Sequence, residues 1–130
     1  MENRWQLRFD NFKKALSTLE EVVPRYKVLT ELEKDGFIQR FEFVFELSWK
    51  VMQDYLKYIG YTDTKGPRPV MTQMAKDGLI DPFVWEEILK VRNELAHIYD
   101  EKKSRDCLDK IVYSFYPELV KFKDLMESKR

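Results

Sequence analysis

Apolar residues recur at steps of three and four along most of the chain, a period that predicts α-helices buried on one side. The first stripe covers residues 5–23 and is closed by Pro24. A second stripe covers residues 37–60, where apolar residues occupy more than one face and Gly60 supplies a C-terminal stop. We therefore expect the second helix to lie centrally and to be buried on more than one side.

The start of the second helix is ambiguous in the sequence. Residues 24–34 are polar and mixed, which indicates a connection that can include one helical turn. Thr30 and Glu33 have the spacing of a capping box, whereas Asp35 before Gly36 is an equally good start signal. The pattern alone leaves both starts open.

Proline and glycine mark the limits of the next two helices. Pro69 is well placed to open a short helix that Gly78 ends. Asp81 followed by Pro82 is an N-cap with proline at the first helical position. The apolar line that follows runs out near His97, so we expect a longer helix from residue 82 to about that point.

The last apolar stripe extends from residue 108 to residue 126, with Pro117 inside it. Proline removes a helical hydrogen bond and its ring clashes with the preceding turn, so this helix is expected to bend or split there. Four main helices, a short helix near 69–77 and short links predict an all-α fold. The expected architecture is an antiparallel up-and-down four-helix bundle that forms one domain over residues 1–130.

Composition narrows the classes of protein that the chain can represent. Lys+Arg and Asp+Glu number 23 each, so the formal net charge is zero, whereas proteins that coat nucleic acid carry a clear basic excess. Cys107 is the only cysteine, which excludes an internal disulfide framework and a zinc site built from cysteines. The N-terminus has no apolar signal region, and no stretch is long and apolar enough for a membrane span. We expect a cytoplasmic protein without membrane contact.

Candidate chemistry is concentrated in the stretch "RNELAHIYD" at residues 92–100, which holds the only histidine of the chain. A histidine near the C-terminus of a helix can simply complement the helix dipole. Arg92 can equally form a surface ion pair with Glu87 or Glu94. An arginine followed five positions later by His97 is therefore a weak signal when taken alone.

The geometry of an α-helix limits whether Arg92 and His97 can act on the same phosphate. On a continuous helix Arg92 and His97 lie about 140° apart, while Asn93 and His97 lie about 40° apart. Arg92 and His97 converge on one phosphate only if the helix ends between them or if two chains contribute. Metal-free RNA cleavage needs a base and an acid, and a twofold dimer would bring two imidazoles and two arginines to one site.

Four segments of the chain, in order, resemble one subfamily of HEPN domains, the helical partners of minimal nucleotidyltransferases. They are "RFEFVFELSWK" (40–50), "GPRPVM" (66–71), "DGLI" (77–80) and "RNELAHIYDE" (92–101). The last segment is similar to the Arg-x4-His-x-Tyr motif of HEPN domains. The resemblance extends over roughly residues 5–125, and the subfamily is the one labelled nucleotidyltransferase substrate-binding proteins.

The resemblance implies a function for each residue of the motif. Arg92 and His97 would be catalytic in a metal-independent RNase toxin, and Asn93 would support them. The partner would be a minimal nucleotidyltransferase encoded nearby, which in some such pairs acts as antitoxin by adenylylating the tyrosine at the position of Tyr99. The implied assembly is a homodimer with RNA as substrate. An older view of the subfamily gives the helical protein a different task, that of holding the substrate for a small nucleotidyltransferase.

Two other polar residues are candidates for supporting roles. Glu46 lies in the most family-like stretch and can orient Arg92 from the neighbouring helix, with a surface ion pair as the alternative. Arg68, between two prolines, is a weaker candidate for phosphate contact than for a structural role. The sequence has no Gly-rich phosphate loop, metal-ligand cluster or nucleotidyltransferase motif. We therefore expect no metal and no cofactor, and no nucleotidyl transfer by this chain itself.

Overall fold

The computed structural model describes residues 3–95 and 101–130, and the side chains of these residues apart from 101–105. His97 and Tyr99 lie outside the described residues. Six α-helices make up most of the described chain, with a 3₁₀ segment and a π turn between them. They are α1 (Arg4–Glu20), η1 (Val23–Val28), α2 (Glu31–Tyr58), α3 (Pro67–Lys76), α4 (Pro82–Leu95), α5 (Glu101–Lys110), the π turn η2 (Ile111–Phe115) and α6 (Tyr116–Lys129).

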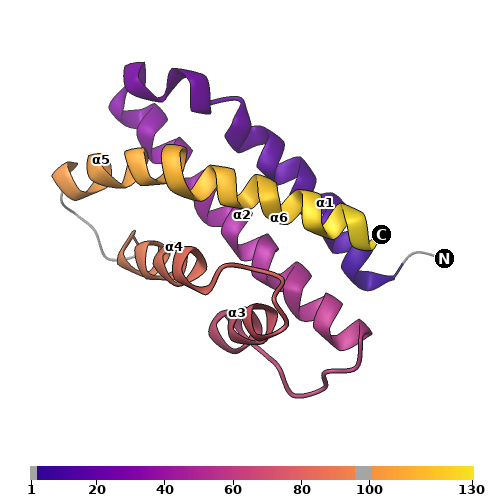
Figure 1. Ribbon diagram of the computed structural model, residues 1–130. Helices are drawn as coiled ribbons and strands as arrows, with labels where there is room; N and C mark the ends of the chain where they lie inside the picture. Colours follow the sequence, from indigo (N-terminus) through magenta and orange to yellow (C-terminus); the bar gives the residue numbers. More distant parts are fainter. Residues whose placement is uncertain (1–2, 96–100) are drawn as a thin grey trace.

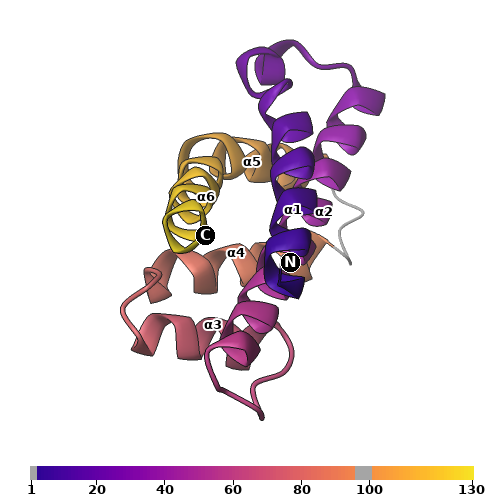
Figure 2. The ribbon, with the colours of Figure 1, turned by 90° about the vertical axis from the view of Figure 1, so that its right-hand side faces the viewer.

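The helices pack into one bundle built on the long pair α1 and α2. These two helices lie side by side and run in opposite directions (Figure 1). α6 packs along α1, and α5 continues its line on the far side of η2. α3 and α4 form a shorter pair, in which α3 contacts α2 and α4 contacts η2 (Figure 2). The predicted all-α fold class is confirmed, and the parts of the chain described contain no helix long and apolar enough to cross a bilayer.

Aromatic side chains join the helices at the centre of the bundle. The ring of Phe122 in α6 meets Phe12 of α1 at 5.4 Å between centroids and Trp85 of α4 at 5.5 Å, both edge to face. Phe41 of α2 stacks on Phe115 of η2 at 5.7 Å. All five rings are buried, and edge-to-face pairs of this kind add to the free energy gained from burying apolar area.

The capping box is the start signal that α2 uses. The backbone N–H of Glu33 donates to Oγ1 of Thr30 at 3.1 Å, and the backbone N–H of Thr30 donates to Oε1 of Glu33 at 3.0 Å. The competing signal, Asp35 with Gly36, lies inside the helix. Residues 24–34 thus contain the expected helical turn, η1, and the first residues of α2.

The short helix begins two residues before the predicted position. We predicted Pro69 as its first residue, whereas α3 starts at Pro67 and Pro69 lies in its first turn. Both prolines are tolerated there because the first N–H groups of a helix have no partner within the helix. Gly66 precedes the helix with φ 86°, a left-handed conformation that glycine adopts without strain, and its N–H donates to Oε1 of Gln53 at 2.9 Å.

The predicted interruption of the last helix is present on the N-terminal side of Pro117. The backbone N–H of Tyr116 donates to the carbonyl of Ile111, five residues earlier, which is the bond of a π turn. Pro117 has no N–H to donate and its ring would clash with a carbonyl in the preceding turn, so the widened turn relieves the mismatch. The chain then continues as α6.

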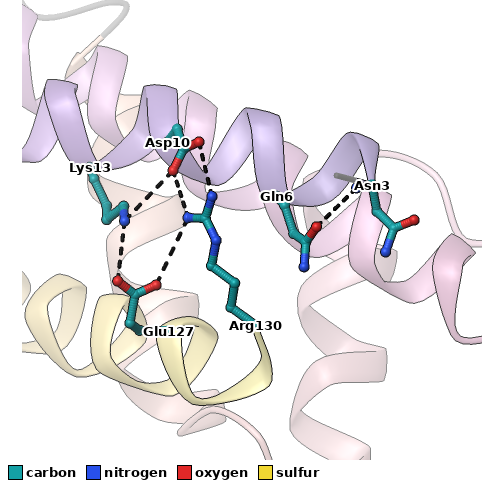
Figure 3. A network of polar contacts seen from close by, with 6 residues as sticks. All are labelled: Asn3, Gln6, Asp10, Lys13, Glu127 and Arg130. Atoms are coloured by element: carbon teal, nitrogen blue, oxygen red, sulfur yellow. Dashed lines mark hydrogen bonds and ion pairs between the residues drawn. The ribbon is translucent and has the colours of Figure 1, made fainter. Parts of the chain in front are cut away.

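A network of charged side chains ties the end of α6 to α1 (Figure 3). The guanidinium of Arg130 donates to both carboxylate oxygens of Asp10, at 2.6 and 3.1 Å. Lys13 lies 3.6 Å from Asp10 and 3.2 Å from Glu127, so it links the two helices as well. The hydrogen bonds from Arg130 hold the pKa of Asp10 below its ordinary value. The network therefore fixes the C-terminal turn of α6 beside the first half of α1.

Candidate functional site

The candidate site lies where a side chain from the C-terminal part of α4 reaches the middle of α2. Nη2 of Arg92, near the C-terminal end of α4, donates to Oε2 of Glu46 in α2 at 2.8 Å. Each side chain is 32% exposed, so the pair lies at the surface but is partly shielded from water. Charge-assisted hydrogen bonds of this length also fix the orientation of the guanidinium plane.

Two further contacts hold Arg92 in place. Nη1 of Arg92 donates to Oδ1 of Asn93 at 3.2 Å, and the guanidinium carbon lies 5.8 Å from the centroid of the Phe45 ring. The second carboxylate oxygen of Glu46 faces Nζ of Lys50 at 3.9 Å, so Glu46 bridges two cations. The guanidinium is thus braced from two helices by a carboxylate, an amide and an aromatic face.

A second carboxylate lies one helical turn before Glu46. Burial raises the pKa of Glu42, and the positive charge of Arg92 opposes this rise. Glu42 and Glu46 share a face of α2 because residues four apart are neighbours on a helix. Arg92 is therefore in the electrostatic range of both carboxylates, although only Glu46 is hydrogen-bonded to it in the described part of the chain.

Cys107 of α5 lies on the buried side of the same region. Burial raises the pKa of its thiol to about 12, Lys110 opposes the rise, and Glu42 and Glu94 add to it. The thiol is consequently protonated at neutral pH and has little nucleophilic character. Cys107 belongs to the hydrophobic core rather than to the reactive groups of the site.

The structure brings together three of the predicted site residues, Arg92, Asn93 and Glu46. The alternative was an ion pair of Arg92 with Glu87 or Glu94 along its own helix. In the structure Arg92 pairs with Glu46 of α2, and Glu87 binds Lys110 at 3.2 Å. The remaining predicted residues, His97 and Tyr99, are outside the described residues, so their roles stay predictions.

The sequence interpretation missed an exposed aromatic side chain beside the site. Phe43 is 60% exposed, although its neighbours Phe41, Val44 and Phe45 are buried. On a helical wheel Phe43 falls opposite the buried stripe and about 60° from Glu46. That offset was readable from the sequence, since a phenylalanine outside the apolar stripe of a helix requires an explanation.

Comparison with known proteins identifies the family. The model of the family described as "Nucleotidyltransferase substrate binding protein like" matches residues 7–128. The probable ribonuclease HepT of Haemophilus influenzae is similar to this chain, with 36% identity over 74 residues, or 53% of this chain and 51% of that protein. The matched segment therefore spans about half the length of that relative.

The fold has a counterpart among solved structures. A crystal structure of a protein from Thermus thermophilus superposes with a TM-score of 0.74 and 25% sequence identity, covering 91% of this chain and 97% of that chain. The family match includes both α2 and α4, which supply Glu46 and Arg92. The chain belongs to the HEPN-type family of nucleotidyltransferase substrate-binding-like proteins, as its four motifs predict.

Proposed function

We propose that this protein is the RNase toxin of a toxin–antitoxin pair whose other member is a minimal nucleotidyltransferase. The observation that carries the proposal is the braced guanidinium of Arg92, held by Glu46 at 2.8 Å and located five residues before the only histidine. Similarity to a probable ribonuclease supports the same reaction class. The reaction is a metal-independent cleavage of RNA with Arg92 and His97 as catalytic residues.

Arg92 binds the scissile phosphate in this proposal. A guanidinium carries five N–H donors in a planar fork that matches phosphate oxygens. Glu46 and Asn93 use two of these donors, and the side chain is 32% exposed, so other donors can meet a substrate. Binding of the non-bridging oxygens stabilises the negative charge that these oxygens carry in the transition state.

His97 supplies proton transfer. One imidazole takes the proton of the RNA 2′-hydroxyl as its oxygen attacks phosphorus, and the bond from phosphorus to the 5′-oxygen breaks. A second imidazole, in its protonated form, gives a proton to the leaving 5′-oxygen. The products are a 2′,3′-cyclic phosphate and a 5′-hydroxyl. Because each chain has one histidine, the second imidazole comes from a second copy in a homodimer.

Phe43 supports the choice of the contact face for that homodimer. Its ring is 60% exposed, and on a helical wheel it lies about 60° around α2 from Glu46. Burial of a phenylalanine side chain contributes about 2 kcal/mol, and aromatic residues are enriched at the centres of interfaces. A second copy placed on this face would cover Phe43 and bring its own Arg92 and His97 toward the same phosphate.

The partner would switch the RNase off at Tyr99. Transfer of AMP from ATP to the hydroxyl of Tyr99, two residues after His97, releases pyrophosphate and the hydroxyl proton. It adds a negative phosphate and a bulky nucleoside to the motif that contains the phosphate-binding arginine. The added charge competes with RNA for Arg92 and blocks access. The minimal nucleotidyltransferase would thus act as the antitoxin.

Cleavage of RNA in the presence of EDTA tests the proposal. The products should carry 2′,3′-cyclic phosphate ends, and Arg92→Ala and His97→Ala should each lower the cleavage rate by about a hundredfold or more. Circular dichroism should show that both variants keep the helical content of the wild type. Equal cleavage by the wild type and the double variant would identify a contaminating nuclease and defeat the proposal.

A second candidate function is a non-catalytic subunit that holds the substrate for the nucleotidyltransferase. The description of the matched family and the zero net charge both favour it, since an RNase that binds RNA unaided benefits from a basic surface. The two functions differ in one readout. A binding subunit would raise the rate of its partner without cleaving RNA, and Arg92→Ala would alter that stimulation.

A further inference from the structure

A cavity lies between α3 and α4, away from the Glu46–Arg92 site. Its volume is about 340 Å³, which is within the range of pockets that bind small organic molecules. None of its lining residues contributes to the Glu46–Arg92 site. The lining residues are Arg68, Met71, Thr72, Ala75, Lys76, Pro82, Trp85 and Glu86.

The floor of the cavity is apolar and rigid. Met71 of α3 and Trp85 of α4 are 5% and 1% exposed, so both are fixed in the core beneath the cavity. Ala75 and Pro82 are small side chains, and they leave the space above this floor open. A flat hydrocarbon or heterocyclic body would bury apolar area against Met71 and Trp85.

The rim of the cavity carries an excess of positive charge. Nη1 of Arg68 donates to both carboxylate oxygens of Glu86 at 2.7 Å, so the charge of Glu86 is compensated by Arg68. Lys76 lines the cavity from the other end of α3, and the described part of the chain gives it no ion-pair partner. Since the two cations are eight residues apart on one helix, they are separated by about 12 Å along its axis.

We infer that this cavity binds a small organic anion that has a flat apolar body. The body would lie on Met71 and Trp85, and the anionic group would be held by Lys76. An anion is selected over a cation because two positive side chains and one negative side chain line the cavity. The volume limits the ligand to a small molecule. This inference does not depend on RNase activity.

A matched pair of aromatic probes tests both parts of the inference. 8-Anilinonaphthalene-1-sulfonate carries the flat body and the anion, and N-phenyl-1-naphthylamine carries the same body without the anion. The folded protein should bind the sulfonate at one site and the neutral probe at least about threefold more weakly, a difference typical of one partly exposed ion pair. Equal affinity for the two probes would overturn the inference that the cavity selects an anion.

The indole N–H signals in a two-dimensional ¹⁵N NMR spectrum locate the bound probe. The indole nitrogens of Trp5, Trp49 and Trp85 are all buried, with no hydrogen-bond acceptor within the described parts of the chain, but Trp85 alone of these lines the cavity. The sulfonate should shift the Trp85 signal and leave those of Trp5 and Trp49 in place. A shift of the other two signals, or of none, would place the probe elsewhere and overturn the site.

Three variants complete the test. Ala75→Leu fills the cavity with a good helix former and should weaken sulfonate binding by about tenfold or more. Lys76→Gln should reduce the affinity for the sulfonate to that for the neutral probe. Lys90→Gln removes an exposed cation of α4 outside the cavity and should leave both affinities unchanged. Unchanged binding by Ala75→Leu, with a wild-type melting temperature, would show that the probe does not occupy this cavity.

Discussion

The carboxylate of Glu46 and the guanidinium of Arg92 meet at 2.8 Å although 46 residues separate them in the chain. The contact exists only when α4 is docked on α2, so the geometry of the candidate site is a product of tertiary packing. A partly exposed ion pair contributes little to stability, about 1 kcal/mol or less. Under the proposed function its value lies in holding the guanidinium of Arg92 in one orientation toward a phosphate.

Replacing Glu46 tests whether this residue orients the guanidinium of Arg92 or only stabilises the fold. Glu46→Gln should lower the rate of RNA cleavage by about tenfold or more, because the guanidinium loses its charged partner and its fixed plane. The unfolding free energy should change by less than about 1 kcal/mol. Asp10→Asn is the matched control, since it removes the carboxylate of another surface arginine pair, with Arg130, between α1 and α6 (Figure 3). An equal loss of activity in both variants would show that Glu46 has no specific role.

Phe43 should control the dimer. Phe43→Ser should weaken self-association by about tenfold or more in sedimentation equilibrium, as expected for loss of an aromatic anchor. RNA cleavage should fall with it and recover at higher protein concentration, because the proposed site needs two chains. Phe83 of α4 is 84% exposed, and Phe83→Ser should leave self-association unchanged. A wild type that remains monomeric at micromolar concentration would exclude the composite site.

Tyr99 should be the residue that the partner modifies. Incubation with ATP, Mg²⁺ and the neighbouring nucleotidyltransferase should add AMP to a peptide containing Tyr99, as read by mass spectrometry, and abolish RNA cleavage. Tyr99→Phe should stay unmodified and active in the presence of the partner. Tyr58, which is 59% exposed on α2, serves as an internal control that should carry no AMP. Equal inhibition of the wild type and Tyr99→Phe would mean that the partner inhibits by binding alone.

The thiol of Cys107 should resist alkylation in the folded protein. Its pKa is raised to about 12 by burial, so at pH 8 iodoacetamide should react with it far more slowly than with the unfolded chain. The raised pKa also makes the free energy of unfolding depend on pH. An unfolded thiol ionises near pH 8.5, so the stabilising contribution is complete below that pH and is lost as pH rises toward 12.

Chemical denaturation at several pH values checks this linkage. Between pH 8.5 and 10 the unfolding free energy of the wild type should fall more steeply than that of Cys107→Ala, by up to about 1.4 kcal/mol per pH unit. The difference between the two slopes isolates the thiol from the lysines and tyrosines that titrate in the same range. Parallel slopes would contradict a raised pKa.

Local signals in the sequence predicted much of the fold. The period of the apolar residues located the helices, and Pro117 predicted the interruption of the last one, because these features act within one or two helical turns. The choice between Thr30 and Asp35 as the start of α2 was not decidable from the pattern, since both residues are good caps. Pro67 was missed as the first residue of α3 because two prolines two residues apart satisfy the same rule.

The site was predictable only in part. Arg92 and Asn93 are adjacent in a motif and bind each other, whereas the contact of Arg92 with Glu46 depends on how two helices are placed, which no periodicity fixes. Family-like sequence around Glu46 was the only available signal for it. The role of Phe45 beneath the guanidinium is likewise a packing result, because its position in the stripe predicts burial and nothing about a cation above the ring.

The tie between Arg130 and Asp10 has a practical consequence for handling the protein. It keeps the C-terminal end of α6 beside α1, and the start of α1 and the end of α6 lie together, away from the C-terminal end of α4 (Figure 1). Purification tags or fluorescent fusions attached at either end would therefore leave the Glu46–Arg92 face uncovered. A short linker could also join the two ends, which makes the bundle a suitable starting point for circular permutation, with new termini opened in the loop between α2 and α3.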